Sequence, residues 1–283
     1  MNSLIKLLNM TDLLKIEWLK IKNYRTFILM SIFFVIGILA VNYIVYTVFD
    51  NMVTNTDAGV LLNKFNPYEF KYVWETISYT SGYLLLLPAM LLIILTTNEY
   101  TFRTNRQNII DGWTRQQFLG VKVLMALLFA ICSTLVVILV GFICGFSTKS
   151  EISFAGFLHV GFFFLKALSY NMFALMISTL VRKTGFAIGV FFIYMGAENI
   201  ISQILDGLSM YIKKLHKIDL GSMGDYLPMN ASDGLLTFPE NPFKSMTKGA
   251  MPTEYVWVVF SFAILYLFLF YFISNRKMLK SDL

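Results

Sequence analysis

The sequence predicts an all-α polytopic membrane protein with six transmembrane helices. Hydrophobic residues make up 57% of the chain and charged residues only 14%, whereas a soluble domain is about 45–50% apolar and about 25% charged. The apolar residues gather in stretches near the length of about 20 residues that crosses a bilayer core. We therefore predict a transmembrane domain over residues 26–274, with spans at 26–49, 74–97, 119–145, 153–181, 186–205 and 254–274.

The distribution of lysine and arginine predicts the orientation of these spans. Short cytoplasmic loops of membrane proteins carry an excess of both residues. With the N-terminus inside, the inside segments 1–25, 98–122, 182–185 and 275–283 hold more of them than the outside segments 50–73, 146–152 and 206–253. We expect a multi-pass protein of a bacterial cytoplasmic membrane, with both termini and the tail 275–283 in the cytoplasm. The net charge of +6 then requires no nucleic-acid partner.

Residues 1–25 precede the first span and predict an amphipathic helix on the membrane surface. Leu7, Met10, Leu14, Trp18 and Ile21 recur at three- and four-residue spacing, so they share one helical face. A helix of this kind lies in the interface and binds membrane lipid, with its tryptophan at headgroup depth. The alternative is a plain cytoplasmic extension of the first span.

The hydrophilic loop 98–118 predicts a short helix between the second and third spans. Glu99 and Arg103 have the i, i+4 spacing of a helical ion pair. Gly112 is suited to a helix C-terminus, and Thr114 with Gln117 matches a capping box that would open the third span. A compact helix held between two spans is shaped to dock a partner, whereas the alternative is an ordinary solvated loop.

The long external segment 206–253 predicts some ordered structure of its own. Leu205, Leu208, Ile212 and Leu215 recur at helical spacing beside several lysines. This pattern indicates an amphipathic helix at the outer surface or dipping back into the membrane.

Two charged residues, Lys166 and Glu198, fall within predicted spans. Such a charge costs at least about 2.5–3.5 kcal/mol at the centre of a helix, so it usually faces a partner or a wet cavity. One interpretation is a Lys166–Glu198 ion pair beside a transport path. The other is that Lys166 extends outward to the interface and that Glu198 lies where the fifth span breaks.

Motifs for catalysis and cofactor binding are missing from the sequence. It has no GxxxxGK[ST] phosphate loop, no metal-binding spacing such as HExxH and no GxSxG nucleophile motif. We therefore predict no enzyme activity, no metal site and no cofactor held by this chain. Cys132 and Cys144 lie inside apolar runs and are predicted to be buried, inert thiols.

Several small residues and one proline within the spans predict local packing features. Gly141 with Gly145, and Gly185 with Gly189, form small-xxx-small patterns that permit close helix approach. Pro88 is predicted to kink the second span.

Three stretches together resemble the membrane subunit of an ABC-2-type exporter. Residues 13–25, which contain Glu17 and Trp18, are similar to the interfacial connecting helix of that family. Residues 226–231, YLPMNA, are similar to a motif in its external segment. The loop after the second span resembles the family pattern E-(Y/F)-x-x-x-T-x-R-x-x-x-x-x-G-x-(S/T)-R. The residues that match this pattern are Glu99, Tyr100, Thr104, Arg106, Gly112, Thr114 and Arg115, and the similar stretch also contains Arg103, Asp111, Phe118 and Lys122.

The resemblance implies a permease that works with separate subunits. It implies a second permease copy, either identical or a close paralogue, and two ABC ATPase subunits that bind ATP and Mg. The loop from Glu99 to Asp111 would be the coupling helix seated in the ATPase, with Glu99, Arg103 and Arg106 important for coupling. Short re-entrant helices would lie in the external segment. The cargo of such exporters is hydrophobic or amphipathic, for example lipids, glycolipids, antimicrobial peptides or drugs.

Two other classes of function remain as alternatives. One is a channel or secondary transporter that works without an ATPase, but the chain shows no similarity between its halves and few intramembrane charges. The other is a membrane-bound sensor or a permease that gives its host immunity to a peptide.

Overall fold

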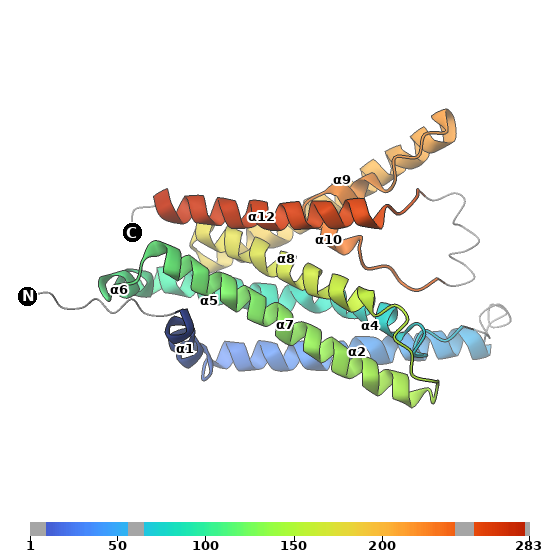
Figure 1. Ribbon diagram of the computed structural model, residues 1–283, viewed down its shortest axis with the longest axis horizontal. Coiled ribbons are helices and arrows are strands. Elements are labelled where there is room, and N and C mark those ends of the chain that lie inside the picture. The colour runs from blue at the N-terminus through green and yellow to red at the C-terminus, as the bar shows by residue number, and fades with distance from the viewer. Residues whose placement is uncertain (1–9, 56–64, 241–251, 281–283) are drawn as a thin grey trace, which may run out of the picture.

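The computed structural model describes residues 10–55, 65–240 and 252–280, and these form a bundle of helices without strands (Figure 1). Six helices are long and apolar enough to cross a membrane, as the sequence predicts, which is the character of a multi-pass membrane protein. They are α2 (Arg25–Asn55), the combined α4 (Val73–Gly82), η1 (Tyr83–Leu85) and α5 (Leu86–Thr101), α7 (Arg115–Ser147), α8 (Leu158–Val181), α9 (Thr184–His216) and α12 (Val256–Lys280).

The shorter helices lie near the two ends of this bundle. Helices α1 (Met10–Ile21) and α6 (Thr104–Ile110) lie at the same end as the last turns of α12, which we call the α6 end (Figure 1). The turn η2 (Met223–Tyr226) and helix α10 (Asn230–Asp233) belong to the connection from α9 to α12, toward the opposite end.

Several boundaries differ from those predicted by hydropathy. Helix α9 continues through His216, so the amphipathic stretch 205–215 is the end of the fifth helix and not a separate one. Helix α8 begins at Leu158 and not at residue 153, because Gly156 with φ +76° breaks the chain just before it. Helix α12 extends to Lys280 and takes in most of the predicted tail. Leu7 of the predicted N-terminal helix lies outside the described residues.

The second membrane-spanning helix is interrupted near Pro88. Proline has no backbone N–H to donate to the carbonyl of Leu84, and its ring crowds that carbonyl. The chain tightens there into the 3₁₀ turn η1, which separates α4 from α5. The irregularity that the sequence predicts therefore lies one turn before the proline.

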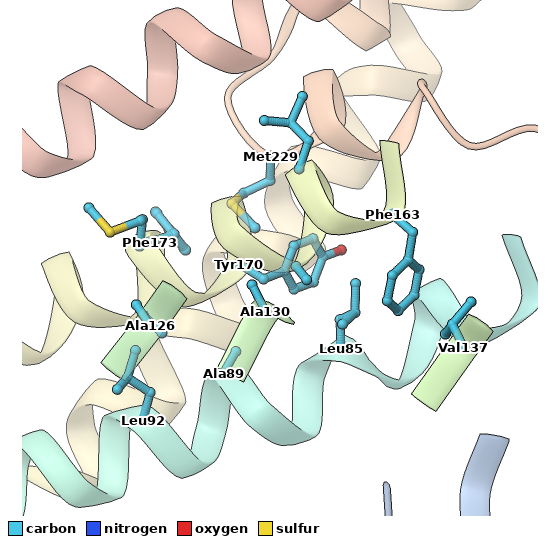
Figure 2. Packing of buried hydrophobic residues seen from close by; sticks show 14 of the residues in the cluster. Leu85, Ala89, Leu92, Ala126, Ala130, Val137, Phe163, Tyr170, Phe173 and Met229 are labelled. Carbon is cyan, nitrogen blue, oxygen red and sulfur yellow. The ribbon is translucent and has the colours of Figure 1, made fainter. Parts of the chain in front are cut away.

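Helix α8 is the centre of the bundle. In its most apolar window 78% of the residues are buried, against 17% for α9 and for α12. It packs against α5, α7 and α12. Small side chains allow this, since Ala89 of α5 and Ala126 and Ala130 of α7 are buried beside the aromatic residues of α8 (Figure 2). The outer helices expose apolar side chains, as helices in lipid do.

One of the two small-residue patterns is used for close packing. A Cβ on Gly141 would lie 2.7 Å from the ring of Trp74, and one on Gly145 would lie 2.6 Å from the ring of Phe70. These glycines therefore admit aromatic rings from the segment before and within α4. No described atom lies within 4 Å of a Cβ built on Gly185 or Gly189.

The two cysteines are free, but their burial differs from the prediction. Cys132 is exposed on α7 and Cys144 is partly buried. An apolar run in a membrane helix has an outer face, and Cys132 lies on that face of α7. The prediction of two buried thiols is therefore wrong for Cys132.

Candidate functional site

The loop between α5 and α7 holds a short helix with defined ends. Arg103 has φ 58°, which ends α5 and starts α6. Gly112 has φ +100° two residues after the end of α6, a conformation that favours glycine. Thr114 then caps α7: its side chain accepts from the N–H of Gln117, and the Gln117 side chain accepts from the N–H of Thr114. The capping box is present as the sequence predicts.

Helix α6 buries amide side chains and exposes apolar and basic ones. Asn105 and Asn108 are buried against the bundle. Phe102 and Ile110 are 72% and 78% exposed. The other exposed residues of this loop are Arg103, Thr104, Arg106, Gln107, Asp111, Gly112 and Thr114. The loop thus presents a mixed apolar and basic surface at the α6 end.

The predicted ion pair between Glu99 and Arg103 does not form. The helical turn that would join them ends at Thr101, and Arg103 adopts a left-handed conformation that removes the i, i+4 geometry. Arg103 is exposed, whereas Glu99 is buried. Glu99 instead pairs with lysines from two other helices.

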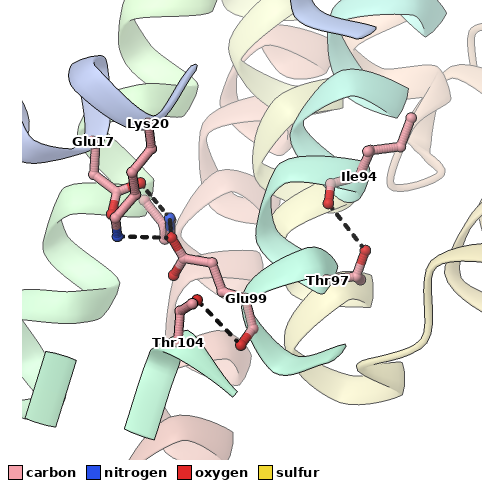
Figure 3. Close-up of polar contacts among 7 residues, drawn as sticks. Glu17, Lys20, Ile94, Thr97, Glu99 and Thr104 are labelled. Atoms are coloured by element: carbon pink, nitrogen blue, oxygen red, sulfur yellow. Dashed lines mark hydrogen bonds and ion pairs between the residues drawn. The ribbon is translucent and has the colours of Figure 1, made fainter. Parts of the chain in front are cut away.

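Four charged side chains meet where α1 packs against α5 and α7. We call them the charge cluster: Glu17 and Lys20 of α1, Glu99 of α5 and Lys122 of α7. The Nζ of Lys122 lies 2.6 Å from Glu17 Oε2 and 2.9 Å from Glu99 Oε1. The Nζ of Lys20 lies 2.8 Å from Glu17 Oε1 and 3.2 Å from Glu99 Oε1. Figure 3 shows Glu17 and Lys20 of α1 directed toward Glu99 at the end of α5. Two carboxylates and two ammonium groups thus balance in charge.

The pairing of these charges matters for stability because two of the four side chains are almost fully buried. Lys122 and Glu17 are 1% and 2% exposed. Burial by itself raises the pKa of Glu17, but Lys122 and Lys20 outweigh it and hold that pKa below its ordinary value. Glu17 is therefore ionised at neutral pH. A buried ion pair of this kind is costly to break, because the remaining partner is left charged and desolvated.

A small apolar cluster surrounds the charge cluster. Leu13, Trp113, Phe118 and Val121 are buried together with Met278 of α12. The Nζ of Lys122 lies 5.4 Å from the centroid of the Phe118 ring. Apolar walls exclude water and strengthen the ion pairs, so α1, the start of α7 and the end of α12 are held as one unit.

Further contacts attach the ends of the helices to this unit. Arg115 donates from Nη1 to the carbonyl of Leu279 at 2.7 Å. The Thr104 hydroxyl donates to the carbonyl of Glu99 at 3.5 Å (Figure 3). Asp111 accepts from the Gln107 side chain at 3.0 Å within α6. Of the residues in the family-like pattern, Glu99 is therefore internal, whereas Arg103 and Arg106 face outward.

The pairing of Lys20 and Lys122 with Glu17 and Glu99 is not predicted by the sequence patterns described above. A signal was present for Lys122, which stands two turns inside the third membrane-spanning helix. A charge at such a position requires a partner. The position of α1 could not be predicted, so nothing in the sequence indicated which carboxylate that partner is.

Trp18 also lies apart from the charge cluster on α1. Its side chain is 55% exposed, and its ring meets that of Phe27 edge to face at 6.2 Å between centroids. The buried face of α1 is formed by Leu13, Glu17 and Ile21. Leu14 and Trp18 instead line an apolar groove that α1 forms with α2, α5 and α7.

Lys166 and Glu198 are both buried but do not pair with each other. Lys166 Nζ lies 3.2 Å from Asp233 Oδ1 of α10. Glu198 Oε1 accepts the backbone N–H groups of Met229 and Asn230 at 2.6 and 2.8 Å. The predicted pair is wrong because the chain before α12 folds back and offers each residue a partner of its own. Glu198 lies within α9, where the helix does not break.

Comparison with known protein families gives one match. A family model described as "Protein of unknown function (DUF2705)" covers residues 52–283. The chain belongs to this family. The matched region contains Glu99, α6, Lys122 and the connection from α9 to α12, but neither α1 nor Glu17. No curated protein matches the chain significantly.

Proposed function

We propose that this chain is the permease subunit of an ATP-driven ABC-2-type exporter for hydrophobic or amphipathic cargo. The observation that carries the proposal is α6, an exposed short helix between the second and third membrane-spanning helices. The exposed Phe102 and Arg103 just before α6, and Arg106 and Ile110 within it, suit a groove on a partner protein. In this proposal α6 is the coupling helix, the α6 end is cytoplasmic, and α1 lies at the inner membrane surface with Trp18 among the lipid headgroups.

The charge cluster supports this proposal because it can transmit a displacement. A helix that couples ATP hydrolysis to transport must move the membrane-spanning helices and not only itself. Glu99 lies in the last turn of α5, just before α6, and forms ion pairs with Lys122 of α7 and Lys20 of α1. A displacement of α6 would therefore be transmitted to α1, α5 and α7 through these ion pairs. Such a displacement would shift the population between two conformational states of the bundle.

The partners follow from the same proposal. Two ABC ATPase subunits would bind ATP and Mg, and a second permease copy, identical or paralogous, would complete the transporter. ATP binding to the ATPase would favour one arrangement of the permeases. The permease itself would carry out no chemistry and hold no cofactor.

The experiment is to purify the tagged chain from its native membrane under mild conditions and identify its bound proteins by mass spectrometry. We expect an ATPase with a phosphate loop at one copy per permease. Arg103→Glu and Arg106→Glu should abolish this association while leaving membrane insertion and folding intact. Arg276→Glu, an exposed charge reversal at the same end, is the matched control and should retain it.

Cargo-stimulated ATP hydrolysis by the complex gives a second measurement. Arg103→Ala should lower the stimulation without changing the amount of inserted permease. A stable complex that contains no ATPase, or unaltered stimulation in Arg103→Ala, would contradict the proposal. The first of these outcomes would favour a channel or secondary carrier.

A further inference from the structure

A second group of charges, one buried and two partly buried, lines a cavity toward the opposite end of the bundle. The cavity has a volume of about 420 Å³ and lies between η1, α8, α9 and α10. Its polar lining includes Tyr83, Lys166, Tyr170, Asn199, Asp225 and Asp233. These residues come from separate helices and from the connection before α12, so the cavity exists only in the folded protein.

The rim of the cavity is formed by exposed side chains of membrane-spanning helices. Tyr83 is 60% exposed and Asn199 is also exposed, and both belong to membrane-spanning helices. Lys166 and Tyr170, by contrast, are buried at its inner side on α8. A ligand that enters past this rim would come from the lipid and bring a polar group inward.

The charges of the lining favour a cationic group. Lys166 and Asp233 neutralise each other at 3.2 Å, and Tyr170 donates its hydroxyl to Asp233 at 3.0 Å. Asp225 remains as a further carboxylate. Among the described residues, no ion pair or side-chain hydrogen bond neutralises it.

The charged groups that act most strongly on the Asp225 carboxyl are other carboxylates. Burial, and then Asp206, Glu254 and Asp233, raise its pKa to about 7. A cation placed in the cavity would relieve this repulsion. Gly234 permits the arrangement, since a Cβ there would lie 2.5 Å from the Asp225 carboxyl carbon.

The tyrosine rings of the cavity already surround one ammonium group. Lys166 Nζ lies 5.6 Å from the ring centroids of both Tyr83 and Tyr170. Gly82 leaves room for it, because a Cβ there would lie 3.0 Å from that nitrogen. Aromatic faces attract cations at such distances, and quaternary ammonium groups are often bound in this way.

We propose that this cavity binds the ammonium headgroup of a cationic amphiphile, between Asp225, Asp233 and the tyrosine rings, with its alkyl chain directed past Tyr83 and Asn199 into the lipid. The assignment of this amphiphile as the cargo rests on the proposed function. Its binding by the chain does not, because every lining residue belongs to one subunit.

The test is photolabelling of the purified full chain in nanodiscs of neutral phosphatidylcholine. The probe is a quaternary alkylammonium with a diazirine in its chain, and the matched probe is the neutral alcohol of the same chain length. We expect the ammonium probe to label peptides that contain residues 79–86 and 195–202 several-fold more than the alcohol. Equal labelling by the two probes would overturn the proposal.

Asp225→Asn removes the carboxylate that is proposed to bind the ammonium headgroup. It should lower labelling by the ammonium probe to the level of the alcohol, whereas Glu151→Gln, an exposed acid in the loop between α7 and α8, should leave labelling unchanged. Retained labelling in a folded Asp225→Asn protein would contradict the proposed site.

A pH series on the unaltered protein tests the same residue without a substitution. The probe keeps its charge at every pH, whereas Asp225 becomes ionised as the pH rises through about 7. Labelling should therefore increase several-fold from pH 6 to pH 8. The other charged groups around it are Asp206 on α9, Glu254 before α12, Asp233 on α10 and Lys166 on α8. Labelling that does not change with pH would count against the site.

The outcomes separate this proposal from the proposed function. Selective ammonium labelling of a chain that binds no ATPase would support the site and remove its interpretation as a cargo site. A complex with an ATPase, in which the two probes label equally, would overturn the site and leave the proposed function in place.

Discussion

Buried charges occur at both ends of the bundle, but they are arranged differently. In the charge cluster two glutamates and two lysines balance in charge, and apolar side chains pack around them. In the cavity toward the other end, one lysine faces two aspartates, and the space between the helices stays open. A closed and balanced cluster holds helices together, whereas an open and unbalanced one can accept a charged ligand. The difference assigns a mechanical role to the first region and a binding role to the second.

The largest effect is expected from removing the central cation of the charge cluster. Lys122→Met leaves Glu17 and Glu99 buried with only the partly exposed Lys20 to neutralise them. The free energy of unfolding should fall by about 3–5 kcal/mol, as when one partner of a buried pair is lost. Denaturant titration of the protein in mixed micelles measures this change.

The matched control is Lys22→Met, an exposed lysine one residue beyond α1. It should change stability by less than about 0.5 kcal/mol. If the two variants are equally stable, the charge cluster does not hold α1 to the bundle, and the mechanical role is wrong.

The next largest effect on stability is expected at Glu198, which accepts hydrogen bonds from the connection between α9 and α12 near the cavity. Glu198→Ala leaves the backbone N–H groups of Met229 and Asn230 without their acceptor. The loss should be about 2–3 kcal/mol, because hydrogen bonds to a charged group contribute more than neutral ones. Hydrogen exchange of residues 229–233 should become faster.

Gln203→Ala, an exposed substitution on the same helix, serves as its control and should leave this exchange unchanged. Protection of residues 229–233 that persists in Glu198→Ala would mean that the connection before α12 is held by other contacts.

A smaller effect is expected at the turn between α6 and α7. Gly112→Ala has free space for its Cβ, so the only cost is the backbone conformation at φ +100°. We expect a loss of about 1 kcal/mol or somewhat more. Gly196→Ala, inside α9 and equally free of contacts, should instead gain up to about 1 kcal/mol. The same sign for both variants would contradict this account of the turn.

The smallest effect on stability is expected when the pH is lowered mildly and the charge cluster at the α6 end is considered. The folded-state pKa of Glu17 lies below its ordinary value of 4.5. Its stabilising contribution is therefore fully present above pH 4.5 and is lost only as the pH falls through the lowered pKa. Thermal unfolding should not change between pH 7 and pH 5.5 on account of this cluster.

Acidification thus offers a direct comparison of the two ends. Over the same pH range Asp225 takes up its proton, so ammonium labelling of the cavity should decrease while the association of α1 with the bundle persists. Release of α1 within this range, seen as faster hydrogen exchange of residues 13–21, would contradict the charge balance of the cluster.

Features that depend on neighbouring residues could be predicted from the amino-acid sequence alone. Apolar stretches of sufficient length define six membrane-spanning helices, and Thr114 with Gln117 defines the start of α7, because each signal lies within a few residues. The irregularity before Pro88 follows from the proline ring itself. The predicted pair of Glu99 with Arg103 failed for a local reason too, since α5 ends between them.

Which charged side chains pair with each other depends on how the helices pack. Glu17 and Lys122 are distant in the sequence, and their contact depends on how α1 turns back across the start of α7. Lys166 and Glu198 both require partners in a low-dielectric interior, which the sequence indicates. Residues 229–233 supply these partners only when the connection before α12 has folded against α8 and α9. The cost of burying a charge can be read from the sequence, whereas the identity of its partner is set by the geometry of the packed helices.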